Sequence, residues 1–104
     1  MHKEFHVDYY QAKIQLRPAD KDLMNFVEKR IKKSKAWISK KINLKSGVDY
    51  YISSNKVARQ IGKGLKRSFK GELKESRKLY SKDRQTSKNI YRVTVCFRLM
   101  REQV

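Results

Sequence analysis

The sequence has one cysteine, one proline, four glycines and no long apolar run, and each scarcity excludes a class of protein. Cys96 alone excludes an internal disulfide and any metal site built from several cysteines. No apolar stretch approaches the roughly 18 residues that a membrane-spanning helix needs, so we expect no membrane partner. Residues 1–6 contain no apolar signal core, so we expect a cytosolic protein.

Recognisable catalytic and metal-binding motifs are also missing. Gly62-Lys63-Gly64 has the spacing neither of a phosphate-binding loop nor of a KH-type clamp. His2 and His6 form no recognisable metal-ligand set, and Cys96 has no histidine beside it in a known motif. No pair of acids lies in the apolar setting that raises a carboxyl pKa for acid–base catalysis. We therefore expect no enzyme, no cofactor and no small-molecule substrate.

Acidic residues are scarce, since ten Asp and Glu stand against 27 Lys and Arg, a formal net charge of +17 over 104 residues. Residues 1–28 carry a net −1 (four basic, five acidic), whereas residues 29–104 carry a net +18 (23 basic, five acidic). Charge of one sign destabilises a compact domain by self-repulsion, and a polyanion relieves the repulsion and releases counterions. Solubility alone rarely requires such an imbalance, so the composition favours nucleic-acid binding.

The apolar content of 38%, with 11% aromatic residues, predicts one folded domain over residues 1–104. Polar and apolar residues alternate over 7–17, with Tyr10 on the same side as Ala12, and alternate most regularly over 90–100, which predicts strands. Helical spacing follows Pro18 and Ser54, where side chains suited to a helix start are present. Residues 38–52 predict a hairpin, although the lysines of 38–44 could equally extend the first helix. Residues 71–80 predict another strand.

This order of elements predicts an α+β ferredoxin-like two-layer sandwich, a βαββαβ core with one additional strand. Two helices would cover one face of a mainly antiparallel sheet. Ala58 and Gly62 are small and four residues apart on the second predicted helix, which would let that helix lie close to the sheet.

Six cations share one face of the second predicted helix, opposite its apolar residues. An ordinary solvated helix face is usually charged too, but it mixes signs, and this face has no acid. We interpret it as a stripe that contacts phosphates. This helix stripe consists of Lys56, Arg59, Lys63, Lys66, Arg67 and Lys70.

A second basic block runs from Lys29 to Lys45, again without an acid, and contains Lys32, Lys33, Lys40 and Lys41. Trp37 lies inside it. The first interpretation is that Trp37 caps the core beneath the helix end. The alternative is a stacking platform for an unpaired base, where an aromatic ring among cations gives sequence-tolerant affinity.

The sheet face turned away from the helices is a third candidate surface. Tyrosines and cations on an open sheet face are how RNA-recognition domains stack bases, but the sequence signature of those domains is absent here. The polar loop 81–89 is long for a hairpin and carries Lys82, Arg84 and Lys88. The residues predicted on the open face are Tyr9, Lys13, Arg17, Tyr51, Lys74, Lys78, Tyr80, Arg92 and Arg98.

Three segments carry a family resemblance: residues 8–17 (DYYQAKIQLR), residues 47–54 (GVDYYISS), and residues 74–79 (KESRKL) with 83–86 (DRQT) and 91–95 (YRVTV). In order and spacing they resemble the conserved middle region of the large-ribosomal-subunit export adaptor, the family named after nonsense-mediated decay, with the archaeal branch nearest. The similarity covers about residues 8–100. The second segment and the Glu-Ser-Arg-Lys run are fairly specific in combination.

The resemblance implies a protein that binds the large ribosomal subunit late in its maturation. Eukaryotic relatives recruit an exportin through a C-terminal signal, and this sequence has no leucine-rich acidic tail for that step. In an archaeal cell, which has no nucleus, the implied role is assembly, quality control or subunit binding. The family also has a cysteine-rich zinc segment upstream of the Asp-Tyr-Tyr strand. Because those cysteines are absent here, we expect this chain to be one domain of a longer protein.

Two functions of different classes fit these observations. The first is a non-enzymatic domain of a large-subunit biogenesis factor that binds ribosomal RNA. The alternative is a protein-docking module whose basic surface binds acidic tails of ribosomal or assembly proteins. For the first function, the anchoring residues that we expect are Lys56, Arg59, Lys63, Lys66 and Arg67.

Overall fold

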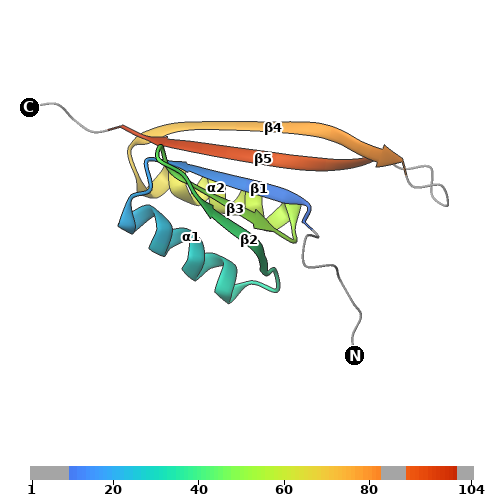
Figure 1. Cartoon of the computed structure of the whole chain (residues 1–104), viewed down its shortest axis with the longest axis horizontal. Coiled ribbons are helices and arrows are strands. Elements are labelled where there is room, and N and C mark those ends of the chain that lie inside the picture. Colours follow the sequence, from blue (N-terminus) through green and yellow to red (C-terminus); the bar gives the residue numbers. More distant parts are fainter. Residues whose placement is uncertain (1–9, 83–88, 101–104) are drawn as a thin grey trace, which may run out of the picture.

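The computed structural model describes the backbone of residues 10–82 and 89–100, and the side chains of residues 10–79 and 91–100. Two helices cover one face of a five-stranded sheet, as Figure 1 shows, which confirms the predicted α+β sandwich. The stretch 38–43 is a strand and not an extension of the first helix. The elements are β1 (Ala12–Arg17), α1 (Lys21–Lys33), β2 (Ile38–Asn43), β3 (Val48–Ile52), α2 (Asn55–Ser68), β4 (Gly71–Lys82) and β5 (Asn89–Leu99).

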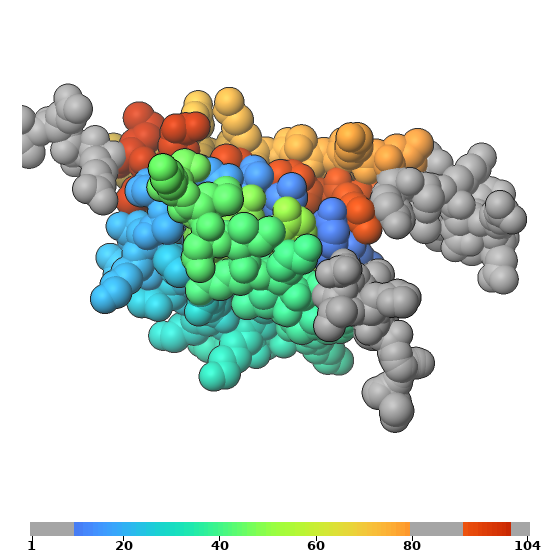
Figure 2. Space-filling model, viewed as in Figure 1, coloured from blue at the N-terminus to red at the C-terminus, as the bar shows by residue number. Residues whose placement is uncertain are grey.

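The sheet has the strand order β2-β3-β1-β5-β4. The β2–β3, β3–β1 and β4–β5 pairs are antiparallel, and only the β1–β5 pair is parallel. Without β5 the order would be β2-β3-β1-β4, which is that of a ferredoxin-like sheet. The additional strand is therefore β5, inserted between β1 and β4. In the space-filling view (Figure 2), the β2–β3 hairpin lies between α1 and the β4–β5 hairpin.

The core lies between the sheet and the two helices, and the alternation in the sequence selects its residues. Every second residue of β1, β3 and β5 faces the helices, because successive strand side chains point to opposite faces. One stripe of each helix packs against them. The fully or almost fully buried residues include Ile14, Leu16, Val48, Tyr50, Val95 and Phe97 from the sheet, and Leu23, Val27, Ile31, Ile61 and Leu65 from the helices.

Capping side chains fix where both helices begin. Asp20 Oδ1 accepts hydrogen bonds from the backbone N–H groups of Asp22 (2.8 Å) and Leu23 (3.3 Å). Ser54 Oγ accepts one from the Val57 N–H at 3.2 Å. Each cap satisfies donors that have no partner within the helix. Pro18, where the sequence predicted the start of α1, therefore lies just before that helix.

The close approach of α2 to the sheet depends on Gly62, as the sequence predicted. A Cβ atom at this position would lie 2.8 Å from Val95 Cγ1, inside van der Waals contact. The small residue lets α2 pack directly on β5, and its cationic side then points away from the sheet. In the described ranges, no helix is both long and apolar enough to cross a membrane.

Candidate nucleic-acid interface

Five of the six cations of the helix stripe lie on the exposed side of α2, whereas Lys70 lies beyond the end of the helix at Ser68. Two of the five are engaged by β4. Arg59 Nε lies 3.1 Å from Glu75 Oε2. Lys66 Nζ donates a hydrogen bond to the Gly71 carbonyl at 3.1 Å. The sequence showed no acid within the stripe, and it could not show that the fold would bring Glu75 beside it. These two cations therefore fasten α2 to the sheet edge.

Three cations of the stripe, Lys56, Lys63 and Arg67, form what we call the helix ridge. All three are exposed, and within residues 10–79 and 91–100 none of them has an ion pair or side-chain hydrogen bond. With a rise of about 1.5 Å per residue, they lie roughly 10 Å and 6 Å apart along the helix axis. The ridge is thus a row of solvated positive charges on a rigid element.

The end of α1 extends this positive surface toward the start of α2. The Arg30 guanidinium lies 4.8 Å from the centre of the Phe26 ring. Phe26 packs closely on α2, because a Cβ at Gly64 would lie 2.9 Å from its ring. Arg30, Lys33, Ser34 and Gln60 line a hollow of about 430 Å³ between the two helices. Lys32 and Lys33 are both exposed in the last turn of α1.

Lys41, predicted to contact RNA, lies on the helix side of the sheet and forms an ion pair there. Its Nζ is 3.0 Å from Glu28 Oε2 on α1. The buried Tyr50 hydroxyl donates a hydrogen bond to the same oxygen at 2.5 Å. The hydrogen bonds from Tyr50 and Lys41 hold the pKa of Glu28 below its ordinary value. Burial, together with the bond to Glu28, raises the pKa of Tyr50 above its ordinary value of 10.0.

Replacing Tyr50 with phenylalanine should lower the free energy of unfolding by about 1 kcal/mol at neutral pH, because the hydrogen bond to Glu28 is lost. This difference should shrink as the pH rises above 10. There the unfolded phenol ionises while the folded phenol keeps its proton, so the wild type loses the contribution of Tyr50. Urea unfolding of both proteins at a series of alkaline pH values measures the difference. A difference that stays constant above pH 10 would contradict the assignment.

Trp37 does not cap the core, because 40% of its surface is exposed. Its backbone N–H donates to Ser53 Oγ at 3.0 Å, and its carbonyl accepts from the Ser53 N–H at 3.1 Å. These bonds hold the segment at the start of the edge strand β2, and Trp37 is not among the side chains that pack against the core. The basic block from Lys29 to Lys45 does not form one surface. Lys41 lies on the helix side of the sheet, whereas Lys40 lies on the open face, with its Nζ 5.4 Å from the centre of the Tyr51 ring.

The open face of the sheet gathers aromatic rings and cations at one end of β1. The Tyr10 and Tyr51 rings meet edge to face, with centroids 4.8 Å apart. Lys13 Nζ lies 5.1 Å from the centre of the Tyr51 ring, and the Arg92 guanidinium lies 4.1 Å from that of Tyr10. Tyr10 was predicted on the core side, but β1 begins only at Ala12, so the alternation does not extend back to Tyr10.

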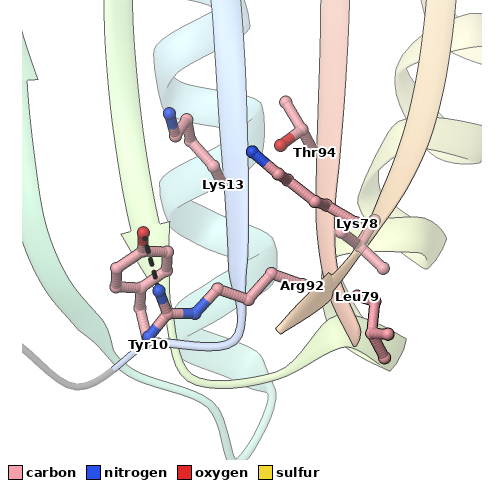
Figure 3. Close-up of a pocket in the computed structure, with 7 residues that line it drawn as sticks. Tyr10, Lys13, Lys78, Leu79, Arg92 and Thr94 are labelled. Atoms are coloured by element: carbon pink, nitrogen blue, oxygen red, sulfur yellow. Dashed lines mark hydrogen bonds between the residues drawn. The ribbon is translucent and has the colours of Figure 1, made fainter. Parts of the chain in front are cut away.

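A hollow of about 350 Å³ adjoins this cluster between β1, β5 and β4, and we call it the sheet hollow. Figure 3 shows Lys78 reaching from β4 across β5 toward Lys13 on β1. Arg92 reaches from β5 to Tyr10 and donates a hydrogen bond to its hydroxyl at 3.3 Å. None of the described residues that line the hollow is acidic. Its lining includes Tyr10, Lys13, Lys78, Leu79, Arg92 and Thr94.

Other described residues predicted on the open face do not line the sheet hollow. Arg17 forms an ion pair with Asp49, at 2.9 Å between Nη1 and Oδ1. Lys74 and Arg98 are exposed, farther along the same face. The side chains of Tyr9, Tyr80, Lys82, Arg84 and Lys88 lie outside the described residues. Sequence reasoning missed Thr94 and the side to which Tyr10 points; the alternation of β5 could have identified Thr94.

The chain is similar to one known family. The family model described as "NMD3, second domain" matches residues 9–99, which is most of the chain. No curated protein matches it. The matched region contains all seven described helices and strands, and with them the helix ridge and the sheet hollow.

Proposed function

Because the chain belongs to the NMD3 family through that family's second domain, we propose that it is a non-enzymatic domain that binds ribosomal RNA of the large subunit. Members of this family act with the large ribosomal subunit as export adaptors, which gives the ribosomal context. The contact that we propose is made by the helix ridge on α2, aided by the cations at the end of α1.

The helix ridge is the observation that carries this proposal. Lys56, Lys63 and Arg67 have no counter-charge in the described part of the chain, although 27 basic residues already repel one another. Phosphates placed along the ridge would neutralise it and release counterions, which supplies most of the affinity of such contacts. Contacts of this kind position a protein on RNA without reading bases. A structured ribosomal RNA helix presents phosphates in the required row.

The proposal leads to a salt-dependent prediction. Replacing Lys56, Lys63 and Arg67 together with glutamine should weaken binding to a labelled RNA hairpin at least tenfold at low salt. The logarithm of the affinity should also depend less steeply on the logarithm of the salt concentration, with a slope smaller by about 3, roughly one for each lost phosphate contact. Fluorescence anisotropy at several KCl concentrations measures both quantities.

A matched control removes the same net charge elsewhere. Lys21, Lys45 and Lys74 are exposed and lie on three separate elements or turns. Their triple glutamine variant should retain most of the affinity and of the salt slope. If both triple variants bind equally, only net charge matters and the ridge is not the site. If an acidic peptide displaces the hairpin and binds more tightly than it does, the domain is a protein-docking module instead.

Membership of the archaeal branch and a cytosolic location stay predictions.

A further inference from the structure

We propose that the sheet hollow binds one unpaired RNA nucleotide, with its phosphate between Lys13 and Lys78 and its base against the stacked Arg92 and Tyr10. This site lies on the opposite face of the sheet from the helix ridge. It deepens the proposed function by naming a second, single-stranded element of the RNA, and the two sites can be tested separately.

The charges around the hollow favour an anion. Lys13, Lys78 and Arg92 converge on it from three neighbouring strands, and none of its described lining residues is acidic. The two described acids on the same face do not compensate Lys13 and Lys78. Asp49 is paired with Arg17, and Glu72 lies opposite Arg98, six residues along β4 from Lys78. Six strand residues span roughly 20 Å, more than twice the screening length of about 8 Å at physiological salt.

The donors at the upper part of the hollow in Figure 3 suit a phosphate. Lys78 Nζ reaches from β4 toward β1, and the Thr94 hydroxyl on β5 lies near it. The Lys13 side chain extends from β1 in the same direction, so its Nζ lies on the β3 side, over the Tyr51 ring. Two ammonium groups and one hydroxyl can donate to several oxygens of one phosphate. A phosphate placed between Lys78 and Lys13 would therefore meet donors from β4, β5 and β1.

The lower part of the hollow suits a flat base. The Arg92 guanidinium is held against the Tyr10 ring at 4.1 Å and is hydrogen-bonded to its hydroxyl, while Tyr51 supports Tyr10 from the edge. Guanidinium planes and aromatic rings are the groups on which unpaired RNA bases stack. Because the stack is already assembled, little side-chain entropy remains to be lost on binding.

The size of the hollow limits the ligand. At about 350 Å³ it falls at the small end of the range for small-molecule sites, which is about 300 to 1,000 Å³. A double helix cannot enter, and its bases are stacked within it, whereas a nucleotide of a single strand can place its base in such a pocket. The acidic side chains of a peptide could satisfy the lysines but offer no ring to stack on Arg92 and Tyr10.

The experiment titrates the folded chain with a tetramer of uridylate and follows amide chemical shifts. The shifts should concentrate on β1, β4 and β5 around the hollow. Arg92→Lys keeps the charge but loses the planar group, so it should weaken binding about tenfold. Arg98→Lys, the same change farther along the same strand and face, should leave binding within twofold. Lys78→Gln, at an exposed position that tolerates substitution, should weaken binding and reduce the salt slope by about one.

Two further ligands decide between the sources of affinity. A tetramer of the same charge without bases should bind at least several-fold more weakly; equal binding would overturn the base-stacking site. A glutamate hexapeptide that gives the same shifts and affinity would overturn the nucleotide and favour an acidic protein. The helix-ridge triple variant should bind the uridylate tetramer normally. If the wild-type chain binds the hairpin but the uridylate tetramer does not bind at the hollow, this inference is rejected and the proposed function stands.

Discussion

Replacing Arg17 with methionine should lower the free energy of unfolding by about 3 kcal/mol, the cost of leaving a buried charge unpaired. Asp49 is only 7% exposed, and Arg17 Nη1 lies 2.9 Å from its Oδ1. Within the described residues this oxygen accepts no aligned hydrogen bond, so the Arg17 charge is what compensates it. Arg17 also donates to the Leu16 carbonyl at 2.9 Å. Urea unfolding monitored by circular dichroism measures the loss.

Arg98 supplies the matched control for Arg17. It lies directly opposite Arg17 in the parallel β1–β5 pair, on the same face, and it is exposed. Arg98→Met should therefore change stability by no more than about 0.5 kcal/mol. The double variant Arg17→Met with Asp49→Leu should regain most of the loss, because a buried ion pair replaced by apolar groups is often neutral. A small loss in Arg17→Met alone would show that Asp49 does not depend on this partner.

Much of the fold could be predicted because its signals are local. Alternation identified β1 and β5, helical spacing identified α1 and α2, and Ser54 marked the start of a helix by its capping chemistry. The strand order could not be read in the same way. Whether β5 pairs with β1 depends on contacts between residues about 80 positions apart, which leave no periodic trace. The place of the additional strand therefore emerged only from the structure.

The candidate interface shows the same division between local and non-local information. The sequence placed five cations on one face of α2 correctly, because that follows from helical geometry alone, but the sixth, Lys70, lies beyond the end of the helix at Ser68. It could not show that Arg59 meets Glu75 or that Lys41 meets Glu28, since each pair joins different elements. The sequence did place Lys13, Lys78 and Arg92 on the open face, but it could not show that the strand order brings them around one hollow, since they come from three strands. Charge composition predicts a polyanionic partner, and only the pairing of strands separates structural cations from those left for a ligand.

The segments that carry the family resemblance now have a physical explanation. The first and second segments form β1 and β3, which pair directly, with Leu16 opposite Val48 and Gln15 opposite Asp49. Arg17 at the end of the first segment pairs with Asp49 in the second. Ser53 and Ser54, at the end of the second segment, fix the start of β2 and cap α2. These residues support the sheet on which both candidate sites lie.

Gly47 opens the second segment, and replacing it with alanine should cost about 2 kcal/mol of stability. A Cβ there would lie 2.0 Å from the Leu16 carbonyl oxygen, so the turn between β2 and β3 would have to move away from β1. Overpacking of this kind costs about 1 to 3 kcal/mol, and the reduced freedom of the unfolded chain offsets only part of it. Ser46→Ala, at the exposed neighbouring turn position, is the control and should have little effect.

The same Cβ would also press on Arg17, at 2.8 Å from its Cδ and 2.9 Å from its Nη1. Gly47→Ala should therefore disturb the Arg17–Asp49 pair as well as the turn. In a background that already carries Arg17→Met, the contact with Nη1 is gone, and the methionine Sδ that replaces Cδ can turn aside because it is not held by Asp49. The cost of Gly47→Ala should then fall by at least about 0.5 kcal/mol, a coupling typical of residues that share a partner. The unfolding free energies of the wild type, the two single variants and the double variant measure this coupling. If the two changes are strictly additive, the turn moves without displacing Arg17, and Gly47 is needed only for the close approach of the turn to the Leu16 carbonyl.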